Sequence, residues 1–107
     1  MTVIVFHSYD YCIPLSMGRW LGEPLRSRGF DPHWQKEMAR AIVRTLIDGF
    51  RIRLQHIADD FPGSMVALNL AGTVKVAEWW DEQHPGKVAA KRLAGKFEKA
   101  INQLLVA

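Results

Sequence analysis

The chain has 107 residues, of which 49% are hydrophobic and 23% charged, a balance typical of folded proteins that excludes intrinsic disorder. Its length suits one small domain over residues 1–107, with a single core and a narrow margin of stability. The net charge is +3, but basic and acidic residues alternate over most of the chain, which argues against a nucleic-acid interface.

The first predicted element is a short strand. Residues 2–6 are mostly β-branched and apolar, the pattern of a strand buried on both faces of a parallel sheet. Residues 7–30 lose this periodicity and carry aromatic side chains among scattered prolines and glycines, which are Pro14, Gly18, Gly22, Pro24 and Gly29. A loop of this length inside a compact domain is often functional.

A long amphipathic helix is predicted next. Asp31 has the character of an N-cap, and Pro32 suits the first helical position. Apolar residues recur at helical spacing over residues 34–57, and the Phe-Pro-Gly sequence of residues 61–63 ends the helix. Gly49 costs about 1 kcal/mol of helix stability relative to alanine unless another segment packs closely there.

The rest of the chain predicts a second strand and a terminal helix. Residues 65–70 form another apolar run, residues 72–80 a loop, and apolar residues between 88 and 104 mark one helix face. The order β-α-β-α predicts an α/β fold with parallel strands joined by a right-handed crossover. Two parallel strands leave unpaired edges, so we expect a homo-oligomer, or docking on a companion chain that supplies the missing strands.

Polar and aromatic side chains gather in the loops that follow the two strands. In a parallel sheet the carboxyl ends of the strands share one edge, where ligands bind, so these loops should meet. The side chains concerned are His7, Ser8, Asp10 and Cys12 from the first loop, and Thr73, Asp81 and His84 from the second.

Asp81 and His84 are the strongest candidate pair. A histidine acting as general base needs a carboxylate on its other ring nitrogen, which fixes the tautomer and stabilises the imidazolium. A separation of three residues lets a turn fold the carboxylate back toward the ring, and Pro85 suits the start of the following helix. The alternative interpretation is a helix cap beside a surface histidine.

The segment around this pair resembles the last motif of the SGNH/GDSL hydrolases, a family of serine esterases, lipases and acetylhydrolases on a flavodoxin-like sheet. Residues 79–85, Trp-Trp-Asp-Glu-Gln-His-Pro, match its Asp-x-x-His pattern, which is often followed by proline and a closing helix. The first strand with residues 7–11, then residues 18–22 and the long helix, are similar to the central strand and following lip of some bacterial members. The resemblance covers most of the chain, but only the later part of the family's domain.

This resemblance implies a partial flavodoxin-like unit in which His84 is the general base and Asp81 its orienting carboxylate. The family's nucleophilic serine and its oxyanion-hole residues lie in earlier motifs, and this sequence contains neither Gly-Asp-Ser nor Gly-x-Asn-Asp. Oxyanion donors alone contribute about 2.7–4 kcal/mol to such catalysis. We therefore expect hydrolysis of a small ester only if a partner completes the Ser-His-Asp site.

Other interpretations stay open. The chain could be a non-catalytic binding or assembly module derived from a hydrolase. Alternatively, Cys12 could replace the missing nucleophile if its loop reaches His84. Trp79 and Trp80 are candidates for lining a substrate pocket, or for simple packing.

The sequence predicts no metal, cofactor or membrane site. The histidines lie in different segments, with no helical pair and no cysteine partner. The single Cys12 excludes an internal disulfide and suits a reducing compartment, so we expect a cytoplasmic protein. No apolar run approaches membrane-spanning length, and the first residues lack a signal-peptide pattern.

Overall fold

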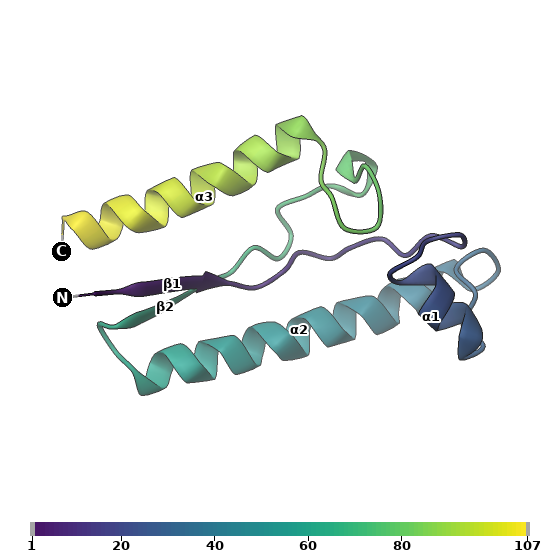
Figure 1. Ribbon diagram of the computed structural model, residues 1–107, viewed down its shortest axis with the longest axis horizontal. Coiled ribbons are helices and arrows are strands. Elements are labelled where there is room, and N and C mark those ends of the chain that lie inside the picture. Colours follow the sequence, from purple (N-terminus) through teal and green to yellow (C-terminus); the bar gives the residue numbers. More distant parts are fainter. Residues whose placement is uncertain (1, 107) are drawn as a thin grey trace.

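The computed structural model describes residues 2–106 and has an α/β fold, as predicted (Figure 1). In that range the elements are, in chain order, β1 (Ile4–His7), α1 (Gly22–Ser27), α2 (Lys36–Asp60), β2 (Met65–Leu68), the 3-10 helix η1 (Val76–Glu78) and α3 (Lys87–Leu105). The two long helices lie on opposite sides of the strands.

The two strands form a parallel pair, which confirms the predicted strand direction. Ile4 is opposite Met65, and the register continues to His7 opposite Leu68. The prediction that the first strand is buried on both faces is wrong, because Ile4 is more than half exposed. With only one neighbouring strand, β1 keeps a free edge, because no other strand within residues 2–106 pairs with it.

The beginning of the long helix differs from the prediction, while its end agrees. The helix starts at Lys36 rather than after Asp31, and it ends at Asp60, just before the Phe-Pro-Gly sequence. The Asp31 carboxylate instead accepts hydrogen bonds from the Ser16 hydroxyl and the His33 backbone N–H, each at 2.9 Å. These contacts hold a turn, because a short acidic side chain bonds local backbone as readily as it caps a helix.

The short helix α1 lies within residues 7–30, which were predicted to be a loop throughout. Its first residue, Gly22, packs so closely that a Cβ there would overlap the carbonyl oxygen of Leu15. The chain leaves α1 through Gly29, whose φ of +86° favours glycine.

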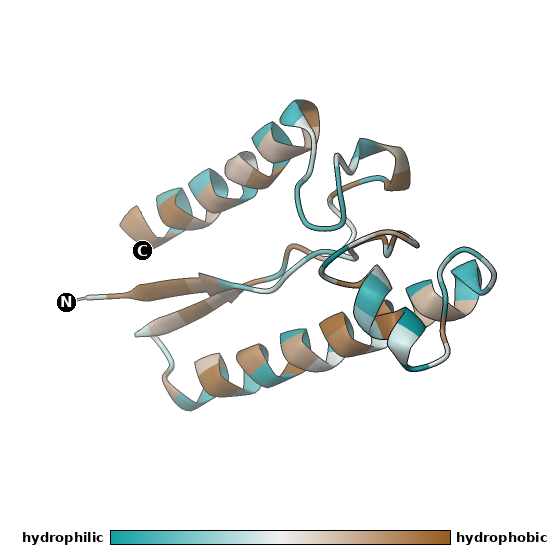
Figure 2. Cartoon of the chain, turned by 45° about the vertical axis from the view of Figure 1, so that its right-hand side comes forward, coloured by the Kyte–Doolittle hydropathy of each residue, from teal (hydrophilic) through white to brown (hydrophobic). Residues whose placement is uncertain are grey.

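The molecule buries few large apolar side chains. Among the described residues, the buried hydrophobic positions are Ala39, Val43, Ala58, Leu70, Val74 and Ala89. The largest fully buried side chains are instead those of Glu82 and Ser8. Apolar and polar positions alternate along both long helices (Figure 2), yet much of the apolar surface stays open.

Membrane-spanning segments were not expected, and within residues 2–106 no helix combines the length and hydropathy needed to cross a bilayer. The overall dimensions are 49 × 30 × 18 Å, so the molecule is a slab whose thinnest direction is about one and a half helix diameters.

Candidate functional site

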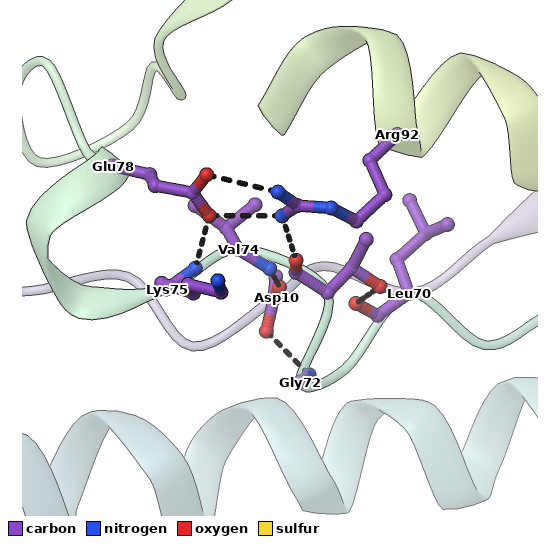
Figure 3. A network of polar contacts seen from close by, with 8 residues as sticks. Asp10, Leu70, Gly72, Val74, Lys75, Glu78 and Arg92 are labelled. Atoms are coloured by element: carbon purple, nitrogen blue, oxygen red, sulfur yellow. Dashed lines mark hydrogen bonds and ion pairs between the residues drawn. The ribbon is translucent and has the colours of Figure 1, made fainter. Parts of the chain in front are cut away.

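The loops that follow the two strands meet, as predicted from their position at the carboxyl ends. The Ser8 hydroxyl oxygen accepts a hydrogen bond from the backbone N–H of Leu70 at 3.0 Å. The Asp10 carboxylate accepts from the backbone N–H groups of Gly72 and Val74, at 2.7 and 2.6 Å (Figure 3). Both side chains are buried and bind the second loop to the first.

An ion pair joins helix α3 to the same loop (Figure 3). The Arg92 guanidinium donates to both carboxylate oxygens of Glu78, at 2.8 and 2.9 Å, and to the carbonyl oxygen of Thr73 at 2.7 Å. The hydrogen bonds from Arg92, and then that from the Lys75 backbone N–H, lower the pKa of Glu78 to about 2. The paired guanidinium therefore fixes the start of α3 against the loop that leads to His84.

Glu82 holds the candidate site in place and was not singled out from the sequence. Its carboxylate is 1% exposed. It accepts four backbone N–H groups at 2.8–3.1 Å, those of Leu15, Trp20, Leu21 and Gly22. Hydrogen bonds to a charged acceptor in a buried position are among the stronger ones in proteins. One side chain thus fastens the loop that carries Asp81 and His84 to residues 15–22.

Gly18 makes room for this carboxylate. A Cβ at that position would overlap the carboxyl group of Glu82. A glycine in a loop can indicate that another group packs closely against the backbone, but it does not identify that group. The sequence therefore did not predict that Glu82 contacts Gly18. The contact partner lies more than 60 residues away.

Asp81 and His84 form a hydrogen-bonded dyad. Nδ1 of His84 lies 2.8 and 3.0 Å from the two carboxylate oxygens of Asp81. The backbone N–H groups of Gln83 and His84 also donate to the carboxylate, each at 2.7 Å. These bonds, led by that from the Gln83 backbone and followed by that from the His84 ring, lower the pKa of Asp81. The turn folds the carboxylate back onto the ring, the local geometry expected from the spacing.

Pro85 is not the first residue of the following helix, which corrects the expected helix start. Helix α3 begins at Lys87 with Gly86 as its N-cap. Pro85 instead forms an antiparallel bridge with Trp79, and the Trp80 backbone N–H donates to the carbonyl oxygen of His84 at 2.8 Å. The dyad therefore sits at the tip of a narrow, closed loop.

The His84 side chain is 59% exposed, and the dyad leaves its Nε2 as the unengaged ring nitrogen. The ring of Trp20 meets the imidazole edge-on, with 6.2 Å between the ring centroids. Beside the dyad loop lies an open groove of about 640 Å³, lined in part by Trp79, Trp80 and Pro85. The arrangement can present an imidazole base next to an apolar surface.

The other residues predicted near the site do not approach the imidazole. The His7 ring packs against Phe97, and its Nδ1 lies 2.8 Å from the Ser8 carbonyl oxygen. The Cys12 thiol points to the carbonyl oxygen of Asp10 at 3.5 Å, and burial raises its pKa. A raised pKa keeps the thiol protonated, the opposite of what a nucleophile needs. Within residues 2–106, no serine, threonine or cysteine side chain hydrogen-bonds to His84.

Metal coordination has no geometric basis in the part of the chain that the structure describes, where no three His, Cys, Asp or Glu side chains cluster suitably. Comparisons with protein-family models, with curated proteins and with solved structures found no match.

Proposed function

We propose that this chain is the part of an SGNH/GDSL-type ester hydrolase that carries the general base. One observation carries the proposal: Nδ1 of His84 lies 2.8 Å from the Asp81 carboxylate. A carboxylate at this nitrogen favours the tautomer whose Nε2 accepts a proton. A partial flavodoxin-like unit, of which the parallel strands would be one portion, belongs to the same proposal, as does a cytoplasmic location.

In the proposed reaction, a serine of another polypeptide attacks the carbonyl carbon of a small ester. Nε2 of His84 takes the hydroxyl proton as the new C–O bond forms, and returns it to the alcohol oxygen as the ester bond breaks. Water then repeats the sequence on the acyl-serine and releases the carboxylic acid. Asp81 stays ionised throughout and stabilises the imidazolium, and its lowered pKa supports this role.

The groove beside the dyad loop would bind the apolar acyl or aryl group of the ester substrate. Trp80 and Pro85 line that groove, and they are the sequence neighbours of Asp81 and His84. The polypeptide that supplies the serine would also have to supply the oxyanion donors, which stabilise the tetrahedral intermediate.

The base can be tested without its partner by using an activated ester. The leaving group of 4-nitrophenyl acetate needs no acid, so an oriented imidazole can accelerate direct attack by water. We expect hydrolysis above the buffer rate for the wild type, and its loss in His84→Ala. The control is His56→Ala, which removes an exposed histidine on α2 and should leave the rate unchanged. Equal rates for wild type and His84→Ala would remove the catalytic claim.

A second variant tests the orienting role. Asp81→Asn keeps the size of the side chain but presents an amide to Nδ1, which favours the wrong tautomer. We expect this variant to lose most of the rate above buffer while its circular dichroism spectrum is retained. Full activity of Asp81→Asn would show that the carboxylate does not orient the ring.

A non-catalytic assembly module is the second candidate function. It is favoured by the absence of a nucleophile beside His84 within the described residues, together with the exposed apolar surface of both long helices. This alternative predicts no hydrolysis by any variant, and unchanged self-association in His84→Ala.

A further inference from the structure

One long side of the slab carries exposed apolar residues from all three layers. A row of rings crosses this side from α3 to α2 past strand β1. The rings of Phe97 and His7 are 5.3 Å apart, those of His7 and Tyr9 are 5.7 Å apart, and Tyr9 stacks on Phe50 at 5.7 Å. We call this side the β1 face, because it runs along the free edge of β1.

The ring row shows which flank of each helix belongs to the β1 face. Residues four or seven positions apart lie on one side of a helix, so the flank of Phe50 includes Leu46 and Ile57. By the same spacing, the flank of Phe97 includes Ile101. All of these except Phe97 are exposed, as is Ile4 on the strand itself.

The opposite side of the slab, along β2, carries lysine and amide side chains beside apolar ones. The shallow groove between the end of β2 and α3 is lined by Asn69, Lys96, Lys99 and Gln103 among others. The Lys96 ammonium group reaches the carbonyl oxygen of Asn69 at 3.5 Å. Exposed apolar side chains also lie outside the β1 face, as at Trp34 and Val88, but the β1 face combines them with a free strand edge.

The accessible surface that this chain exposes beyond that of a compact monomer is similar in area to the surface buried in a stable dimer. The accessible surface is 7583 Å², whereas a folded monomer of 12.2 kDa should expose about 6,100 Å². The radius of gyration is 15.9 Å, against about 13 Å for a compact chain of this length. An excess of about 1,500 Å² on each of two chains falls in the range of obligate homodimer interfaces.

We propose that the β1 face binds a second copy of this chain across a two-fold axis. An edge strand related to its copy by such an axis pairs antiparallel, so β1 meets β1 and the sheet grows to four strands. This closes the open edge, and it places each helix flank against the same flank of the other copy. The apolar surface of one chain is then covered by the matching surface of the next.

The positions of residues along the direction of β1 show where the proposed two-fold axis passes. Helix α2 runs opposite to β1 (Figure 1), and the stack of Tyr9 on Phe50 aligns the two. The middle of β1 lies about 12 Å from Tyr9, toward the start of the strand. On α2 this distance corresponds to about eight residues beyond Phe50, so the middle of β1 falls beside Ile57. The contact of His7 with Phe97 aligns α3 in the same way and puts Ile101 at that level. An exposed isoleucine on each helix therefore sits next to the axis.

The charged residues on the same flank of α2 are consistent with a two-fold axis near Ile57. Arg53 and Asp60 are exposed on α2 and seven residues apart, two turns along one side of the helix. An antiparallel copy related by an axis near Ile57 places Arg53 opposite Asp60 of the other chain at both ends of the contact. The only charges on this part of the flank thus meet their opposites.

The assembly leaves the dyad accessible. The loop of Asp81 and His84 lies beyond the carboxyl ends of the strands, away from the centre of the β1 face (Figure 1). Dimerisation can therefore succeed or fail independently of ester hydrolysis.

The first test is the mass in solution. Sedimentation equilibrium of the wild type at micromolar concentration should give twice the chain mass of 12.2 kDa. Ile57→Glu buries a charge beside the axis and should raise the dissociation constant at least about tenfold. Ile52→Glu is the matched control, because Ile52 and Ile57 are both 45% exposed on α2 while Ile52 lies off the β1 face. A monomeric wild type, or an Ile57→Glu dimer as tight as that of Ile52→Glu, would overturn the proposal.

Charge reversal at Arg53 and Asp60 provides a second test, which remains valid if Ile57→Glu does not fold. Arg53→Asp and Asp60→Arg should each weaken the dimer, since each places like charges opposite one another. The double variant restores opposite charges and should recover most of the wild-type affinity. Circular dichroism checks that all three are folded. Weakening by both single changes without recovery in the double variant would refute the two-fold arrangement.

Discussion

The loop end of the slab and its β1 face are organised by different forces. At the loop end, buried carboxylates of Asp10 and Glu82 collect six inter-loop hydrogen bonds from backbone N–H groups. Along the β1 face, apolar side chains such as Phe50 and Ile101 stay exposed, and the strand edge has no neighbour within residues 2–106.

This contrast follows from the size of the sheet. Two strands offer too little surface to bury the apolar flanks of two long helices, so most large hydrophobic side chains find no core. Loop backbone can be ordered without a core, because one buried carboxylate satisfies several N–H groups that would otherwise need water. The chain therefore orders its candidate site by itself, while large apolar side chains on its helices stay exposed.

The largest effect is expected from Glu82→Gln, which keeps the shape of the side chain. An amide nitrogen cannot accept hydrogen bonds, so at least two of the four N–H groups lose their partner. We expect a loss of about 3 kcal/mol in the free energy of unfolding, measured by urea denaturation. The exposed Glu98→Gln on α3 is the control and should change stability by less than about 0.5 kcal/mol. Equal stability of the two variants would show that Glu82 does not hold the loops together.

The same substitution at two glycines should have opposite effects in the two regions. Gly18→Ala forces a methyl group against the buried Glu82 carboxyl group, and should cost about 2 kcal/mol. At Gly49 on α2 nothing lies within 4 Å of an added Cβ, so Gly49→Ala should stabilise the helix by up to about 1 kcal/mol. Thermal denaturation of both variants decides the matter. Destabilisation by Gly49→Ala would contradict the open surroundings seen there.

The smallest effect is expected from Glu78→Gln, at the surface where α3 meets the loop. The pKa of Glu78 is lowered to about 2 in the folded chain, from 4.5. The ionised carboxylate therefore stabilises the fold above pH 4.5, and this contribution disappears as the pH falls toward 2. Urea denaturation should show wild type more stable than Glu78→Gln at pH 6, with the difference shrinking below pH 4.5. A difference that grew on acidification would have the wrong sign for this ion pair.

Several features could be predicted from the sequence because they depend on neighbours along the chain. The apolar runs predicted both strands, the Phe-Pro-Gly sequence predicted the end of α2, and the spacing of Asp81 and His84 predicted their contact. Each depends on periodicity or on a turn of a few residues, where local conformation decides the outcome. The meeting of the two loops was predictable as well, because it follows from parallel strands alone.

The catalytic roles of Asp81 and His84 and the kinship with hydrolases remain predictions, since a contact between two side chains does not establish a reaction. The prediction of a helix start at Asp31 was wrong, because the Asp31 carboxylate accepts hydrogen bonds from Ser16 and His33 that hold a turn instead.

The sequence by itself determined the order of the two strands and the two long helices, the direction of the strands and the local dyad. Only the tertiary structure decided that Glu82 would secure the dyad loop, because its four N–H partners lie 60 to 67 residues away and no periodicity encodes such a contact. Only the tertiary structure, too, decided which flanks of the helices stay open. An amphipathic pattern states that a face is apolar, whereas the width of the sheet determines how much of that face it can cover.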